Sequence, residues 1–196
     1  MALFPTAYFP SILYIKTIGQ FEAIEIEIQE TFPKQTIRTR TSILSSNGAL
    51  LLSVPIKHNS LVGNEKTQNI LIDNSRNWQL NHLRTIKSAY ASAPYFDDYF
   101  WKLEELLQPL KYQLLVEMNL DIIRFFLESI GLNVNITLNS SFIKNHEIRD
   151  MDFLDSNTKL PVYYQVFSNK FEFKSNLSFL DLLMNEGPLA RNYILS

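Results

Sequence analysis

The chain of 196 residues contains no cysteine, which excludes disulfides, thiolate nucleophiles and thiolate metal ligands. It has three histidines, His58, His82 and His146, and these are far apart in the sequence. Because no two of them have the spacing of a ligand pair, the sequence predicts no zinc site. Any chemistry must therefore use Arg, Lys, His, Tyr, Ser and carboxylate side chains, and we expect no metal and no cofactor.

Charge and long apolar runs are also scarce. Charged residues make up 19% of the chain and the formal net charge is -2, which argues against a strongly basic nucleic-acid-binding face. No stretch approaches the ~20 uncharged apolar residues needed to span a bilayer. The apolar opening "MALFPTAYFPSILYIK" has no basic start and is interrupted by prolines, so it does not resemble a signal peptide. We therefore expect a cytoplasmic protein without a nucleic-acid partner or a membrane span.

Hydrophobic and aromatic residues are plentiful, at 46% and 13% of the chain. A chain of this length and composition can bury a large core as a single domain over residues 1–196. It contains no repeat, no low-complexity run and no linker rich in Gly or Ser.

The first third of the sequence has the pattern of strands. "AIEIEIQE" and "TIRTRTSIL" alternate between apolar and polar residues, which predicts strands over 24–29 and 36–44. Asn47-Gly48 is a strong hairpin signal, and "ALLLSVPIK" predicts the returning strand. A short helix is expected over 10–18, ending near Gly19, and a short strand over 69–73.

After Asp73 the apolar period becomes helical. The first helix carries one apolar stripe and ends before Pro94, a second helix reaches Pro109, and a long third helix ends at Gly131. "PVYYQVF" predicts a late strand, and "SFLDLLMNEG" a last helix. The sequence thus predicts an α+β fold in which N-terminal, mostly antiparallel strands pack against a C-terminal set of helices. The stripe of the first helix comprises Trp78, His82, Ile86, Ala89 and Ala93.

The arginines of "FPKQTIRTR" form the first candidate site. On a strand, Arg38 and Arg40 would lie on one face, roughly 6–7 Å apart from a rise of ~3.3 Å per residue. Two guanidinium groups at that spacing can converge on a phosphate, diphosphate or carboxylate, and Lys34 could add a third positive charge. The structural alternative is a ladder of ion pairs with Glu25 and Glu27 across an antiparallel strand pair.

His82 is the second candidate. It shares a stripe with Trp78 and Ile86, so it faces the core or a cleft. A half-buried imidazole suits a general acid or base, whereas a lone histidine on an apolar face is more often a packed, hydrogen-bonded residue.

Two further segments carry polar groups near a break in the structure. "SAYASAPYFDDY" places Tyr90, Tyr95, Asp97 and Asp98 around a joint between helices, where they could line a pocket, or could form core and helix caps. "PIKHN" places Lys57 and His58 in a loop after a strand. An exposed loop without function is the simpler interpretation of the second segment.

Several fragments together resemble a known family. In order, they are "YFP" (8–10), "KQTIRTR" (34–40), "NG" (47–48), "LSVPIKH" (52–58), "ILID" (70–73), "WQLNHLRTIKSAYASAPYF" (78–96), "MNL" (118–120) and "NLSFLDLLMNEGP" (176–188). Their order and spacing are similar to those of the WbqC-like protein family, in a form typical of Bacteroidetes-type bacteria. The family's opening Gln-Pro is replaced here by "PTAYFP", so a role for that glutamine does not carry over.

The resemblance implies a role in surface-polysaccharide (O-antigen) biosynthesis, as a transferase acting on an activated sugar. It also implies functional interest in polar positions that overlap the candidates above. The matching positions are Lys34, Arg38, Arg40, Pro55, Trp78, His82, Tyr90, Pro94 and Tyr95.

Two hypotheses of different classes follow. In the first, the chain is a group transferase on a nucleotide-activated or phosphorylated sugar, with His82 and Tyr90 as catalytic residues. In the second, the chain is a non-catalytic binding or scaffold protein with an anion-binding cleft. The expected partner is a small anionic ligand or nucleotide sugar, or, in the second hypothesis, an acidic segment of a partner protein. Neither hypothesis fixes an oligomeric state. The expected substrate-binding residues are Lys34, Arg38, Arg40, Lys57, Trp78 and Tyr95.

Overall fold

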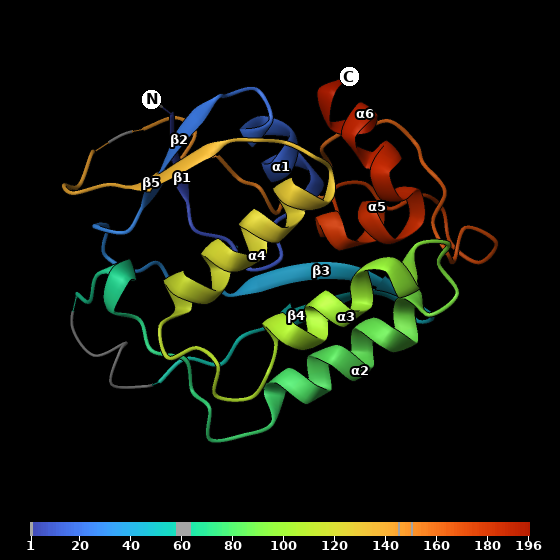
Figure 1. Ribbon diagram of the computed structural model, residues 1–196, viewed down its shortest axis with the longest axis horizontal. Helices are drawn as coiled ribbons and strands as arrows, with labels where there is room; N and C mark the ends of the chain where they lie inside the picture. Colours follow the sequence, from blue (N-terminus) through green and yellow to red (C-terminus); the bar gives the residue numbers. More distant parts are fainter. Residues whose placement is uncertain (1, 58–63, 145, 150) are drawn as a thin grey trace.

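The computed structural model describes residues 2–57, 64–144, 146–149 and 151–196 (Figure 1). It contains a parallel sheet of three strands in the order β1-β2-β5, with bounds β1 Ala2–Pro5, β2 Ala23–Glu27 and β5 Asn135–Leu138. Parallel strands need a crossover connection, and helix α1 (Ile12–Ile18) makes the one between β1 and β2. Ile24 and Ile26 of β2 are fully buried.

A separate antiparallel hairpin is formed by β3 (Arg40–Ser45) and β4 (Gly48–Ser53). Its turn pairs Ser45 with Gly48, and Gly48 has a positive φ of 104°. The hairpin is thus the one that Asn47-Gly48 predicts. A short 3₁₀ helix, η2 (Thr67–Asn69), follows later in the chain.

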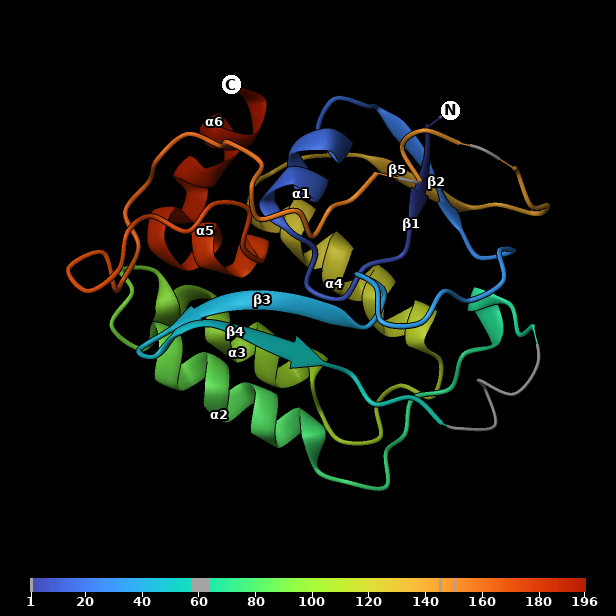
Figure 2. The same cartoon turned by 180° about the vertical axis from the view of Figure 1, so that it is seen from behind.

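Helices fill the space around the two sheets. α2 (Trp78–Tyr90) packs against β3 of the hairpin, and α3 (Phe96–Leu106) packs against α2. α4 (Leu115–Ser129) runs between the hairpin and the parallel sheet (Figures 1 and 2). α4 is buried over most of its surface, as expected of a central helix. The chain ends with α5 (Phe179–Glu186), η3 (Gly187–Leu189) and α6 (Ala190–Leu195), of which α5 and α6 pack on α1.

The fold is a single α+β domain, as the sequence predicts. The predicted stripe of the first helix is buried throughout, and α1 ends at Gly19 as expected. α3 ends at Leu106, ahead of Pro109, and α4 ends at Ser129, two residues before Gly131 in the left-handed region at φ 64°.

Several strand predictions are wrong in detail. The alternative of an ion-pair ladder, in which the strand over 24–29 pairs antiparallel with residues 36–44, is also wrong, because β2 lies in parallel register between β1 and β5. Antiparallel pairing therefore holds for the hairpin and not for the larger sheet. Residues 36–39 form a turn, so β3 begins only at Arg40. Residues 161–167 are not a strand, and residues 69–73 form only isolated bridges, Ile56 with Ile72 and Leu71 with Leu114.

Gly187 ends α5 in a conformation that side chains rarely adopt, with φ 55° and ψ -129°. A Cβ at this position would lie 2.5 Å from the ring of Tyr95, whose N–H donates to the carbonyl of Met184 (3.0 Å). We expect Gly187→Ala to lower the free energy of unfolding by about 2 kcal/mol, because backbone strain and the ring contact both oppose it. Urea unfolding measures the loss.

Gly48→Ala is the matched control, because Gly48 also has a positive φ but a Cβ added there would meet nothing within 4 Å. Its loss should reflect backbone strain alone and be smaller. Equal losses for the two variants would show that the Tyr95 ring moves aside freely.

Candidate functional site

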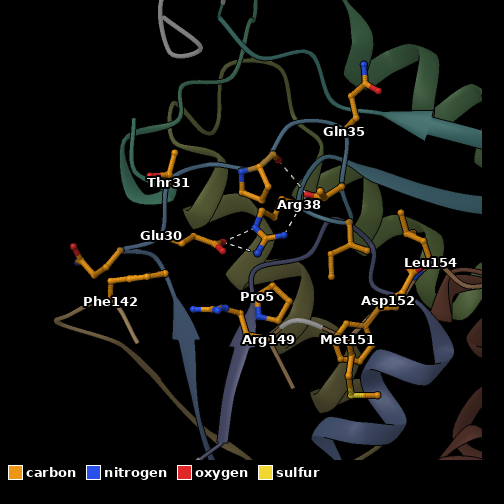
Figure 3. A pocket seen from close by; sticks show the side chains of 15 residues that line it. Pro5, Glu30, Thr31, Gln35, Arg38, Phe142, Arg149, Met151, Asp152 and Leu154 are labelled. Atoms are coloured by element: carbon orange, nitrogen blue, oxygen red, sulfur yellow. Dashed lines mark hydrogen bonds and ion pairs between the residues drawn. The ribbon is translucent and has the colours of Figure 1, made fainter. Parts of the chain in front are cut away.

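The parallel sheet places the ends of its three strands at one edge. β1 ends at Pro5, β2 at Glu27 and β5 at Leu138, and in open parallel sheets the crevice outside the carboxyl ends is the usual ligand position. A cavity of about 630 Å³ lies here (Figure 3). Its lining residues are Pro5, Gln29, Glu30, Thr31, Pro33, Gln35, Thr36, Ile37, Arg38, Phe142, Arg149, Met151, Asp152, Phe153 and Leu154.

A buried ion pair between Glu30 and Arg38 forms one wall of this cavity. Nε of Arg38 donates to Oε1 of Glu30 (2.6 Å), and Nη2 lies 2.5 Å from the same oxygen. Nη1 donates to Oγ1 of Thr36 (3.2 Å), while Thr67 donates its hydroxyl to Glu30 (3.2 Å). Both charged residues are less than 8% exposed. The pair is therefore bound within the protein before any ligand arrives.

Burial acts on the charges of this pair in opposite directions. Loss of hydration raises the pKa of the Glu30 carboxyl and lowers the pKa of the Arg38 guanidinium, and the attraction between the two groups acts against both shifts. The turn that carries Arg38 is also bound to α4, because Nδ2 of Asn119 in that helix donates to the Arg38 carbonyl (2.9 Å). Arg38 is thus fixed at both its side chain and its backbone.

A second arginine, Arg149, lies in the same cavity. Its Nη1 is 3.6 Å from Oε2 of Glu27, it donates to the carbonyl of Ile143, and its guanidinium stacks over the ring of Phe142 with 5.0 Å to the centroid. Glu27 is fully buried behind it, and its Oε1 accepts from the N–H groups of Gln29 (2.7 Å) and Glu30 (3.0 Å). Two carboxylates and two guanidinium groups thus lie together, with no net charge among the four.

The rim of the cavity combines apolar and polar side chains. Phe142 and Met151 are 52% and 40% exposed, and Asp152 and Gln35 are also exposed. Figure 3 shows Phe142 and Met151 on opposite sides of the Glu30–Arg38 pair. Carboxylate acceptors beside guanidinium donors, next to an aromatic face, can hydrogen-bond hydroxyl groups and stack on a sugar ring or a base.

His82 lies away from this cavity, in the core beside the β1–α1 loop. A hydrogen bond of 2.7 Å joins its Nδ1 to the hydroxyl of Tyr8, and its ring meets that of Trp78 edge to face at 5.1 Å. Burial lowers its pKa to about 4, so the imidazole is neutral at neutral pH. Asp97 and Asp98, which could have oriented it, are exposed in the first turn of α3. This geometry favours the packed, hydrogen-bonded alternative for His82.

The predicted arginine pair is not formed. Arg38 belongs to the turn before β3, whereas Arg40 begins β3 opposite Ser53, so the two do not share a strand face. Lys34 is exposed and does not line the cavity, although Pro33 and Gln35 on either side of it do. Of the predicted site residues that the structure describes, Arg38 is the one that lines the cavity.

The remaining predicted residues do not meet at one site, although Trp78 contacts His82. Tyr90 is fully buried and donates to Asp181 (2.9 Å), Trp78 donates to Asn74 (3.4 Å), and Tyr95 packs on Gly187. Lys57 is exposed after β4, with its N–H bound to the carbonyl of Leu71 (2.9 Å). His58 lies outside the described residues.

Sequence reasoning missed most of the cavity, including Glu30, Phe142, Arg149 and Asp152. The available signal was at the end of the alternating segment 24–29, where Glu27 ends the strand and a second acidic residue, Glu30, follows three positions later. It becomes informative only when β2 is known to be the central strand of a parallel sheet.

Comparison with known proteins places the chain in a family. The family model described as the WbqC-like protein family matches residues 6–154. The chain belongs to the WbqC-like protein family. Except for Pro5, every residue lining the cavity lies within the matched stretch. No curated protein and no solved structure matches the chain.

Two further features are absent from the described part of this WbqC-like chain. No helix there is long and apolar enough to cross a membrane. No group of three or more His, Asp or Glu side chains among those residues is arranged to hold a metal ion.

The buried imidazole of His82 predicts a specific pH dependence. Because its folded pKa of about 4 lies below the usual 6.5, the stability that comes from keeping it neutral is present above pH 6.5 and is lost on acidification. We expect the stability advantage of the wild type over His82→Gln to shrink by about 2 kcal/mol between pH 7 and 5. Urea unfolding at a series of pH values gives this difference.

Arg84→Gln, an exposed change on the same helix, is the control and should leave the pH profile unchanged. A constant difference between wild type and His82→Gln would mean that the imidazole titrates normally in the folded protein.

Proposed function

We propose that this WbqC-like protein binds a phosphorylated or nucleotide-activated sugar in the cavity at the carboxyl edge of the parallel sheet and acts there as a cytoplasmic group transferase in surface-polysaccharide (O-antigen) biosynthesis. The observation that carries the proposal is the cavity itself, in which guanidinium and carboxylate groups lie together with an aromatic ring. Its volume of about 630 Å³ falls in the range of small-molecule sites.

Different lining residues bind different parts of the ligand. Hydroxyl groups of a sugar pair with the acceptors Glu30 and Asp152, and phosphate oxygens with the guanidinium groups of Arg38 and Arg149. Phe142, half exposed at the rim, provides the face on which a sugar or base stacks. A proton released by an attacking hydroxyl or amine would pass to one of the two carboxylates that line the cavity.

The second candidate function is non-catalytic binding, in which the same cavity holds an anionic ligand without turnover. The positions of the predicted catalytic residues favour it, because His82 and Tyr90 lie in the core rather than in the cavity.

A thermal-shift screen tests the proposal. Nucleotide sugars, sugar phosphates, nucleoside diphosphates, acyl-CoA, amino acids and pyridoxal phosphate are added to wild type, Phe142→Ala and Asp152→Asn. Both substitutions are at exposed positions, so the variants should fold normally. We expect one sugar-phosphate class to stabilise the wild type by about 2.7 kcal/mol at a hundred times its Kd, and each variant to need several-fold more ligand.

Trp101→Ala is the control, because Trp101 is 59% exposed on α3 and does not line the cavity. A shift that survives both cavity variants would place the ligand elsewhere. Incubation of the stabilising ligand with candidate acceptors then separates the two functions, since only a transferase consumes it.

A further inference from the structure

A second cavity of about 480 Å³ adjoins the first. Leu154 lines both, so the two cavities meet at this residue. The second cavity lies between the start of α1, strand β3 and the segment 156–178. Its lining residues are Ser11, Thr41, Ser42, Ala49, Leu154, Ser156, Asn157, Phe173, Lys174, Ser175, Asn176, Leu177 and Ser178.

The lining of this cavity differs chemically from that of the first. It is dominated by hydroxyl and amide groups, and Lys174 is the only charged residue among the described residues that line it. The neighbouring Asp155 does not line it and accepts the N–H of Asn157 (2.8 Å). Charge alone therefore favours an uncharged or anionic ligand over a cationic one.

Part of this polar lining is already used and part is not. The hydroxyls of Thr41 and Ser178 donate to the carbonyl of Phe9 (2.7 and 3.0 Å). By contrast, the side chains of Ser156 and Asn157 and the ammonium group of Lys174 have no hydrogen-bond partner within the described part of the chain, and all three residues are exposed. These three groups remain available to a ligand.

The backbone that carries Lys174 is held in place. Gln165 accepts the Lys174 N–H at its Oε1 (3.0 Å) and donates from Nε2 to the Lys174 carbonyl (2.9 Å). Gln165 is 1% exposed and also donates to the buried carboxylate of Asp181 (2.9 Å). The main chain at Lys174 is thus fixed, while its side chain is exposed.

The two cavities differ in how much of their lining the family match covers. It ends at Leu154, so it includes nearly all of the first cavity, whereas residues 156 and 157 and 173–178 of the second lie beyond it. On the basis of the proposed function, we propose that the second cavity binds the second substrate of the transfer, a small hydroxylated molecule with a carboxylate or phosphate group that pairs with Lys174. The first cavity then holds the activated sugar, and the second sets which acceptor this chain uses.

The absence of cysteine allows each cavity to be probed separately. Single cysteines are introduced as Ser156→Cys and Asn157→Cys in the second cavity, Met151→Cys in the first, and Ser88→Cys on the exposed face of α2 as control. The rate of alkylation of each is measured with glucose, glucuronate, glucose 1-phosphate and inorganic phosphate. A carboxylate source and a phosphate source are thereby distinguished.

We expect glucuronate or glucose 1-phosphate to slow alkylation at Ser156→Cys or Asn157→Cys roughly tenfold at about ten times the Kd, with no effect at Ser88→Cys. Lys174→Met, added to each variant, should remove this protection. If no compound protects either second-cavity cysteine, or if protection persists without Lys174, the proposal is overturned. Protection at Met151→Cys tests the proposed function separately, so the two can fail independently.

Discussion

Replacement of Arg38 by methionine should lower the free energy of unfolding by about 3–5 kcal/mol, because it leaves the Glu30 carboxylate buried without its cation. In the folded protein two nitrogens of the guanidinium contact one oxygen of Glu30, at 2.6 and 2.5 Å, and both side chains are nearly inaccessible. Methionine fills similar space but offers no charge. The remaining donor to this oxygen, the hydroxyl of Thr67 at 3.2 Å, is too weak to compensate for the loss.

A double-mutant cycle assigns this loss to the pair. Arg38→Met/Glu30→Leu should recover most of the stability, since replacing both members of a buried ion pair by apolar groups is often neutral. The deficit of the single variant should also shrink as pH falls, because protonation of Glu30 removes the unpaired charge. Urea unfolding of the four proteins at pH 7 and 5 measures both effects.

Arg40→Met is the matched control and should change stability by less than about 1 kcal/mol, since Arg40 is only half-buried at the start of β3. The opposite pattern, in which Arg38→Met keeps its stability but loses ligand binding, would make Arg38 a ligand residue that needs no internal partner.

The local parts of this fold follow from local sequence signals. Asn47-Gly48 predicts the β3–β4 hairpin, and the helical stripe from Trp78 to Ala93 predicts which face of α2 is buried. Each signal involves residues close together in the chain, so propensity and period are sufficient.

The parallel sheet could not be predicted in this way. β1 is four residues long, and β5 is a polar segment, "NITL", that pairs with β2 from more than a hundred positions away. The alternation of "TIRTRTSIL" predicts a strand, but residues 36–39 form a turn. Backbone hydrogen bonds from the N–H groups of Thr39 and Arg40 to the Thr36 carbonyl (3.1 Å each) hold this turn. The cavity is formed at the edge of the parallel sheet and includes Arg149, which is far along the chain. Most of its residues therefore could not be predicted from local sequence patterns.

A buried carboxylate, Asp181 in α5, is the other position where a large effect is expected. It is fully buried and accepts hydrogen bonds from the hydroxyls of Tyr90 (2.9 Å) and Tyr163 (2.5 Å) and from the amide of Gln165 (2.9 Å). These bonds join α2, α5 and the segment before α5. Asp181→Leu should lower the free energy of unfolding by at least about 3 kcal/mol, because three buried donors lose their acceptor.

Tyr90→Phe removes one of these donors and leaves the carboxylate with two, so it should cost about 1 kcal/mol. The same variant tests the sequence-based hypothesis that Tyr90 is catalytic. Its hydroxyl is inaccessible in the folded protein, so ligand binding and any turnover should be unchanged. Lost turnover in a stable Tyr90→Phe protein would contradict a purely structural role.

The pH dependence of Asp181→Asn provides the decisive measurement for the cluster. Burial raises the pKa of Asp181 to about 6 from its usual 3.8, so the folded state binds the proton more tightly than the unfolded state does. The contribution of this group to stability therefore rises as pH falls from 6 towards 4, and is lost as pH rises through 6. Asparagine does not titrate, so the wild type should gain about 2–3 kcal/mol relative to Asp181→Asn over that interval.

This pH dependence has the opposite sign to that of His82, whose neutral form stabilises the fold at higher pH. A wild-type advantage that instead falls on acidification would show that the three donors outweigh burial and hold Asp181 ionised.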